Sequence, residues 1–272
     1  MKEHFAFWVG GLHVHVEGGG SGKPLLLLHG LGGPVMWQKV APLLEKTFTV
    51  YRVHLPGFGY SSKPAVEYTI PFFMDILHKT VLSIGVRPFT LGGISMGGQI
   101  AVEYAAANPA FVQKLILIGS TGVTCPAPWL RNIVAWRLFS PVLEGFLLKH
   151  KAPVCFSARR SFYDLSSRPE GLCDKAFYFL NQPGGTGAWV RAFHAVISEN
   201  TRNFVATLET LNIPSLIVWG MNDRVMPVRS AHLFRQSLKG SKLVTFENCG
   251  HSVPLEKPQD LAEVITHFVE IE

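Results

Sequence analysis

The chain has 272 residues, of which 16% are charged and 47% hydrophobic, and its formal net charge is +6. This apolar content excludes a disordered chain, and the length predicts one large domain or one domain with an insertion. The positive charge does not indicate nucleic-acid binding, because no Lys/Arg-rich block or basic-aromatic stripe accompanies it. The sequence also lacks a run of 18 apolar residues, so no membrane-spanning helix is predicted.

Four cysteines are spread along the sequence, at Cys125, Cys155, Cys173 and Cys249. They form no C-x-x-C pair and no Cys/His spacing typical of zinc ligands, so we predict no metal site. We interpret all four as small buried hydrophobic residues. Low cysteine usage is typical of a reducing compartment, and the apolar run at residues 5–9 is too short for a signal peptide. We therefore expect a cytoplasmic location.

Short apolar runs alternate with helical patterns along the first 121 residues. Residues 5–9 and 12–16, joined by Gly10-Gly11, predict a β-hairpin. Runs that are apolar throughout are typical of strands buried on both faces of a sheet. They predict strands at residues 25–28, 48–53, 89–94 and 115–118, with helices at residues 71–84 and 96–107.

The alternation stops at about Gly122 and resumes with a buried strand at residues 215–219. A helix is then predicted at 228–238, a strand at 242–246 and a final helix at 259–268. The whole pattern predicts an α/β fold whose mostly parallel, eight-stranded sheet has helices on both faces. We predict a core domain of residues 1–121 and 201–272, with a helical cap inserted at residues 122–200.

The segment Gly93-Ile94-Ser95-Met96-Gly97 lies between a predicted strand and a predicted helix. This is the G-x-S-x-G pattern of a nucleophile elbow, in which a tight turn lifts a serine hydroxyl clear of the sheet. The helix N-terminus behind the turn favours developing negative charge. Gly and Ser are also ordinary turn residues, so it is the strand–turn–helix context that makes Ser95 a candidate nucleophile.

A glycine-rich loop, His29-Gly30-Leu31-Gly32-Gly33, follows the predicted strand at residues 25–28. Acyl transfer needs two backbone N–H groups that bind the oxyanion, and Leu31 and Met96 are the candidates. A plain glycine-rich turn would have the same sequence. We interpret His29 as a residue that organises this loop rather than as a base.

A serine nucleophile needs a base, and the base needs a group that orients it. His251 follows the predicted strand 242–246, and Asp223 follows the predicted strand 215–219. Both positions, like Ser95, lie beyond the carboxyl ends of strands, where open α/β sheets place their sites. The rival histidines do not lie on a loop after a late strand; they are His54, His78, His194 and His232. Of the rival acids, Asp164 and Asp174 lie in the insertion and Glu247 is on the strand end itself.

With these motifs the chain resembles the α/β-hydrolase fold proteins that carry a helical cap after the sixth strand. The resemblance rests on five motifs in order: residues 29–33, Leu55-Pro56-Gly57-Phe58-Gly59-Tyr60-Ser61, residues 93–98, Gly220-x-x-Asp223-x-x-x-Pro227 and Gly250-His251-x-x-x-x-Glu256-x-Pro258. It implies Ser95 as nucleophile, His251 as base and Asp223 as orienting acid, without a cofactor. The chain departs from the family at His54, where relatives commonly have Asp.

A serine at the elbow favours ester chemistry, since relatives that open epoxides generally use Asp there. The sequence Ser252-Val253-Pro254-Leu255-Glu256 after the candidate base looks more like carboxylesterases and monoacylglycerol-lipase-like enzymes than like carbon–carbon bond hydrolases, which often carry Trp after the histidine. Carbon–carbon hydrolysis of a vinylogous diketo acid stays open as an alternative. So do cofactor-free perhydrolysis and a non-catalytic ligand receptor on the same fold.

Residues 121–200 hold nine Lys/Arg against five Asp/Glu, together with three tryptophans and seven phenylalanines. This composition predicts a small hydrophobic ester substrate and contact between the cap and a lipid surface. Packing of the cap helices explains the same residues without any ligand. The candidate substrate-binding residues are His29, Gly30, Phe58, Trp129, Trp136, Trp189, Trp219, Val225, Met226 and Ser252.

Overall fold

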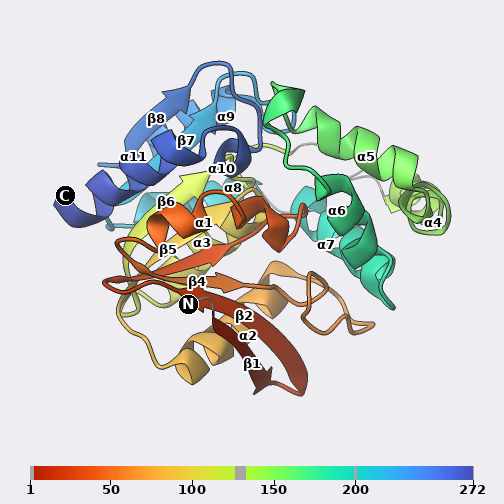
Figure 1. The fold of residues 1–272 in the computed structure, drawn as a ribbon, viewed down its shortest axis with the longest axis horizontal. Coiled ribbons are helices and arrows are strands. Elements are labelled where there is room, and N and C mark those ends of the chain that lie inside the picture. The colour runs from red at the N-terminus through yellow and green to blue at the C-terminus, as the bar shows by residue number, and fades with distance from the viewer. Residues whose placement is uncertain (1–2, 126–132, 199–200, 272) are drawn as a thin grey trace.

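The computed structural model describes residues 3–125, 133–198 and 201–271, and Figure 1 shows its fold. Eight strands form one sheet in the order β1-β2-β4-β3-β5-β6-β7-β8. β1 and β2 pair antiparallel, as do β2 and β4, and the remaining neighbours are parallel. The strands are β1 (Glu3–Val9), β2 (Leu12–Gly19), β3 (Pro24–Leu28), β4 (Thr49–Val53), β5 (Phe89–Ile94), β6 (Val112–Ile118), β7 (Ser215–Gly220) and β8 (Lys242–Phe246). The predicted mostly parallel eight-stranded sheet is confirmed.

Helices cover both faces of this sheet. On β3, Leu26 and Leu28 belong to one apolar cluster and Leu25 and Leu27 to the other. The first cluster also contains side chains of α2 (Ile70–Ile84), α3 (Met96–Ala107), α8 (Thr201–Thr210) and α9 (Arg229–Ser237). The second contains side chains of α1 (Ala41–Leu44), α10 (Val253–Glu256), α11 (Pro258–Ile271) and the 3-10 turn η1 (Pro34–Trp37). Two-sided burial is the physical reason for the uninterrupted apolar runs in the sequence.

Residues 133–198, between β6 and α8, form a separate group of helices, drawn in green and teal on the right of Figure 1. They are α4 (Ile133–Gly145), α5 (Lys151–Arg160), α6 (Leu172–Leu180) and α7 (Gly185–Ser198), with 3-10 turns η3 (Leu147–Lys149) and η4 (Leu165–Ser167). Trp136, Leu143 and Ile197 are among the side chains of a small apolar core that α4 and α7 share. The domain boundaries at 121/122 and 200/201 stay a prediction, and α8 packs into the main core through Phe204 and Leu208.

No helix in the described ranges is long and apolar enough to cross a membrane. The helix α2 shows how a helix that packs on the sheet begins and ends. α2 begins after Thr69, whose hydroxyl accepts a hydrogen bond from Phe72 N, and ends at Gly85 with φ +77°. These are ordinary N-terminal and C-terminal capping arrangements, and the helix predicted at residues 71–84 is confirmed.

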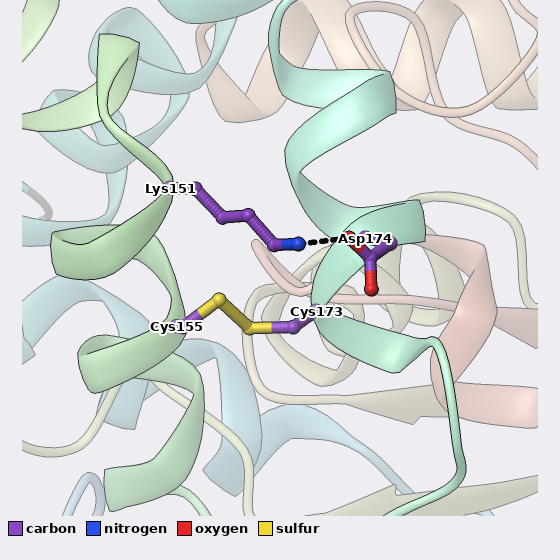
Figure 2. Close-up of a disulfide and its surroundings, with 4 residues drawn as sticks. All are labelled: Lys151, Cys155, Cys173 and Asp174. Atoms are coloured by element: carbon purple, nitrogen blue, oxygen red, sulfur yellow. Dashed lines mark hydrogen bonds and ion pairs between the residues drawn. A yellow bond between two sulfur atoms is a disulfide. The ribbon is translucent and has the colours of Figure 1, made fainter.

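The interpretation of all four cysteines as small buried hydrophobic residues is confirmed for Cys249, whereas Cys125 is only half-buried and the other two are paired. Cys155 on α5 and Cys173 on α6 form a disulfide with a Cα–Cα distance of 5.5 Å, as Figure 2 shows. Lys151 and Asp174 form an ion pair beside it, between the same two helices. The pairing was not visible in the sequence, because it depends on how α5 packs against α6. With this disulfide present, cysteine usage no longer supports a reducing compartment, and the cytoplasmic location stays a prediction.

Candidate active site

Ser95 stands at the sharp turn between β5 and α3. Its φ of 55° is unusual for a residue with a side chain, and such strain is concentrated at functional positions. Ser95 N donates to Ile118 O at 2.9 Å, and Ser95 O accepts from Gly98 N at 3.0 Å. A side chain at Gly93 would collide with the backbone of Gly97, so the turn requires glycine. Neighbouring backbone therefore holds the serine in this conformation.

The loop after β3 passes directly beside this turn. A Cβ atom at Gly30 would lie 2.7 Å from Ser95 Cβ and 3.3 Å from Met96 N, so only glycine lets the two segments approach this closely. Met96 is the first residue of α3, and the first N–H groups of a helix have no partner within it. Trp189 Nε1 on α7 donates to Leu31 O at 3.0 Å, which ties the loop to the cap.

His29 is fully buried at the start of this loop. Its Nδ1 donates to Gly30 O at 2.7 Å, and its Nε2 accepts from Leu55 N at 3.0 Å. Burial lowers the pKa of His29 to about 3, so the ring is neutral at pH 7. Phe58 packs its ring edge-on against the imidazole, with 5.1 Å between ring centroids. Both nitrogens are used structurally, which fits the predicted role in organising the loop.

Asp223 and His251 form a buried pair beyond the ends of β7 and β8. His251 Nδ1 donates to Asp223 Oδ2 at 2.7 Å. The other carboxylate oxygen, Oδ1, accepts from Val225 N and Met226 N, each at 2.8 Å. Trp219 Nε1 donates to Met226 O at 2.8 Å and so fixes the loop from below. Backbone N–H groups therefore fix one oxygen of the Asp223 carboxylate, and the other oxygen orients the imidazole ring of His251.

Gly119, directly after β6, was not singled out in the sequence, yet it supports this pair. Its φ is +50°, and a Cβ atom there would lie 3.0 Å from His251 Nδ1 and 3.5 Å from Asp223 Oδ2. β6 lies between β5 and β7 in the sheet. The residue before Gly119, Ile118, accepts the hydrogen bond from Ser95 N. The His–Asp pair therefore rests on the chain segment that neighbours the serine turn.

Glu256 is a second residue whose role the sequence motif did not reveal. Its carboxylate accepts from Gly250 N at 2.8 Å on one oxygen, and on the other from Tyr163 N at 2.8 Å and Asp164 N at 3.2 Å. Burial raises the pKa of Glu256 against the opposing effect of these three bonds. Gly250 precedes the candidate base, whereas residues 163–164 follow α5. One carboxylate thus joins the histidine loop to the cap.

Ser252, a candidate substrate-binding residue, belongs to the same junction. Its N donates to Ser161 O and its Oγ to Ser161 Oγ, both at 2.9 Å. Ser161 is the residue after α5. Because its N–H and hydroxyl both contact the cap, Ser252 is placed to fix the loop that carries His251.

The remaining substrate-binding candidates differ in where the structure places them. Trp189 reaches the glycine loop. Trp136 stacks on His194 at 4.6 Å between ring centroids, inside the cap. Trp219 is fully buried beneath the loop that carries Asp223, so it supports Asp223 and exposes no side-chain surface to a substrate. Trp129 lies outside the described residues.

A cavity of about 340 Å³ lies between the α2 region and α7, and its lining contains none of the three predicted catalytic residues. We therefore do not take it as the substrate site. Its lining residues are Glu67, Tyr68, Thr69, Ile70, Pro71, Arg191, His194, Ala195 and Ser198.

Four of the rival histidines and acids have other partners. His54 Nε2 lies 3.4 Å from Glu17 Oε1, and His78 Nδ1 lies 3.2 Å from Tyr104 Oη. Asp164 accepts a hydrogen bond from Ser166 N at 2.8 Å, and Asp174 pairs with Lys151. None of these contacts joins a histidine to a carboxylate beside Ser95.

A family model of the α/β hydrolase fold matches residues 23–258. The chain belongs to the α/β hydrolase fold family. The match contains all of β3 to β8, the inserted helices and the segments that carry Ser95, Asp223 and His251.

The chain is similar to human monoacylglycerol lipase ABHD6, with 28% identity over 263 residues that cover 91% of this chain and 75% of that protein. Among solved structures, a membrane phospholipase A described as a bacterial virulence factor has 29% identity and a TM-score of 0.79, covering 99% of this chain and 86% of that one. A serine hydrolase of carbazole degradation superposes with a TM-score of 0.84 at 21% identity over all of both chains, which shows the shared fold. The two lipase relatives support ester hydrolysis.

Proposed function

We propose that the protein hydrolyses carboxylic esters through an acyl-enzyme on Ser95. The observation that carries the proposal is the 2.7 Å hydrogen bond from His251 Nδ1 to Asp223, held over Gly119 next to the serine turn. With Nδ1–H donating to the carboxylate, the lone pair of His251 Nε2 is free to accept a proton from a serine hydroxyl.

We propose that the reaction has two halves. His251 Nε2 takes the proton of Ser95 Oγ as the oxygen attacks the ester carbonyl, and Asp223 stabilises the imidazolium that forms. The N–H groups of Leu31 and Met96 stabilise the oxyanion. His251 then gives its proton to the departing alcohol. In the second half His251 activates water, which releases the acid and restores Ser95.

The substrate we propose is an ester with an apolar acyl or alcohol part. Trp189 anchors the cap to the glycine loop. Near it, Phe58 belongs to the main apolar core and Leu31 packs against that core. An apolar wall with a few polar groups is typical of sites for such ligands. The monoacylglycerol lipase and phospholipase A relatives support the same class of substrate.

Steady-state hydrolysis of p-nitrophenyl esters of increasing acyl length tests this proposal. We expect saturable turnover that Ser95→Ala reduces to the background rate. Thr207→Ala is the matched control, since Thr207 is a half-buried residue of α8 whose hydroxyl donates to Asn203 O of the same helix, and it should keep full activity. Absence of turnover with every ester, or undiminished turnover by Ser95→Ala, would contradict the proposal. Fluorophosphonate labelling without ester turnover would instead favour carbon–carbon hydrolysis.

We also propose that the outer face of α4 contacts a lipid surface from which the substrate is drawn. Leu138 and Val142 of α4 and Phe146 directly after it follow one another at four-residue spacing and are 72%, 47% and 59% exposed. Exposed Lys149 and Lys151 lie next along the chain. An apolar stripe with adjacent cations is typical of helices that lie in the interface of anionic membranes. Wild-type protein should float with anionic liposomes and Leu138→Asp/Phe146→Asp should not; wild-type protein that stays unbound would contradict this.

A further inference from the structure

The outward face of the N-terminal hairpin carries a group of histidines for which the hydrolase reaction has no use. On β2, Val14 and Val16 are fully buried on one face, so His13, His15 and Glu17 point to the other. The antiparallel register places His4 of β1 directly opposite Glu17. Cross-strand partners share a face, so His4, His15 and Glu17 converge.

The distances within this group match those of metal ligands. One ligand atom from each of His4, His15 and Glu17 can be chosen so that all three lie within 4.8 Å of one another. His4 Nδ1 and His15 Nε2 are 3.2 Å apart. Two nitrogens bound at about 2.0–2.1 Å to one tetrahedral Zn²⁺ are separated by about 3.3 Å. The two rings already stand at nearly the spacing that a shared ion would impose.

A second layer of side chains holds the carboxylate in place. Arg52 Nη1 lies 2.9 Å from Glu17 Oε2, and His54 Nε2 lies 3.4 Å from Oε1. Arg52 also lies 3.4 Å from Glu45, so its one positive charge is shared between two carboxylates and the cluster keeps a net negative charge. Partners of this kind orient metal ligands and are a regular part of metal sites. They also give His54, the departure from the family motif, a role.

We propose that His4, His15 and Glu17 bind a divalent transition-metal ion of the Zn²⁺ class on the outer face of the β1–β2 hairpin. His4 is exposed, so water completes the coordination. The site is separate from the catalytic residues, because β4 and β3 lie between β2 and the serine strand β5. The ion would cross-link β1, an edge strand, to β2.

Zinc titration of the untagged full-length protein by isothermal calorimetry tests the site. We expect one Zn²⁺ per chain, with affinity at least about tenfold weaker in His4→Gln and in His15→Gln. His13→Gln is the matched control, because His13 lies on the same strand and face but outside the group. His251→Gln controls for zinc at the catalytic histidine, and both controls should bind like wild type.

Thermal unfolding gives a second readout that does not depend on activity. An ion that binds only the folded state raises the unfolding temperature, so Zn²⁺ should stabilise wild type and His13→Gln but not His4→Gln. His4 is exposed, so its replacement leaves the fold intact. Absence of zinc binding by wild type, or undiminished binding by both His4→Gln and His15→Gln, would overturn the proposal and leave only a hydrogen bond between the two rings. Neither result bears on ester hydrolysis, which the Ser95 experiments test.

Discussion

Asp223→Asn should abolish most of the activity while leaving the fold intact. The reason is that the surrounding backbone fixes the orientation of the new amide, and this orientation favours the wrong tautomer of His251. Asp223 Oδ1 accepts from Val225 N and Met226 N, so the amide oxygen must take that position. The amide NH₂ then faces His251 Nδ1 in place of Oδ2. Since an NH₂ group only donates, Nδ1 must accept and the proton moves to Nε2. That tautomer cannot take the proton of Ser95.

The magnitude follows from the same contacts. Turning the amide over would lose two backbone hydrogen bonds of about 1 kcal/mol each, so the inactive arrangement is favoured by about 30-fold or more. The variant also loses the negative charge that stabilises the imidazolium. In a serine protease the equivalent change lowers kcat by about 10⁴-fold, and we expect a loss of that order here.

The assay is kcat for a p-nitrophenyl ester, with thermal unfolding as the check of folding. Asp75→Asn is the control, since Asp75 is an exposed residue of α2 whose carboxylate pairs with Lys79 Nζ at 2.6 Å. Surface pairs of this kind contribute about 0–1 kcal/mol, so its kcat should match wild type. A folded Asp223→Asn enzyme with kcat within tenfold of wild type would refute the reasoning.

Three further changes have defined outcomes. Gly119→Ala should cost about 1–2 kcal/mol of stability, because φ is +50°, and should lower kcat at least tenfold by displacing His251; unchanged kinetics would contradict this. His29, with a pKa lowered by burial to about 3 from 6.5, stays neutral when folded but binds a proton when unfolded, so stability should fall as pH drops from 6.5 toward 3. Urea unfolding at pH 7 and pH 5 should show this fall in wild type but less of it in His29→Asn. Replacing Cys155 and Cys173 with serine should lower the unfolding free energy by about 3 kcal/mol, measured in guanidinium, and no change would argue against the bond.

The core sheet could be predicted from the sequence because its signals are local. Leu25–Leu28 is apolar throughout since alternate residues enter the two cores, and Gly10-Gly11, with φ of 56° and 77°, is a two-glycine hairpin turn. The short helices α1 and α10 were not predicted. Each has only four residues, too few for a helical period to show.

The cap was predicted as an insertion but not in its internal arrangement. On α4, Leu143 is buried while Leu138 is exposed, and Pro141 interrupts the pattern. Apolar residues therefore do not mark a single face. The disulfide between Cys155 and Cys173 depends on the packing of α5 against α6, which no local pattern encodes.

The candidate catalytic residues were found from the turn sequences around them, whereas the residues that hold them in place were not. Position 119 requires glycine because a side chain there would crowd His251, which is far along the chain. Glu256 stands in the motif after His251, but its bonds to Tyr163 and Asp164 depend on where the cap returns to the core. Both roles arise from contacts between distant segments, which spacing alone does not show.

Mass spectrometry after reaction with a fluorophosphonate tests the central claim most directly, because the reagent phosphonylates only an activated serine. We predict one adduct per chain, located on the peptide that contains Ser95, and its loss in Ser95→Ala and in His251→Gln. Trypsin cleavage after Lys79 and Lys114 releases that peptide, because the Arg87–Pro88 bond is not a trypsin site, and fragmentation of the peptide assigns the adduct to the turn after β5. No adduct on the folded protein, or an adduct that persists in Ser95→Ala, would contradict the account.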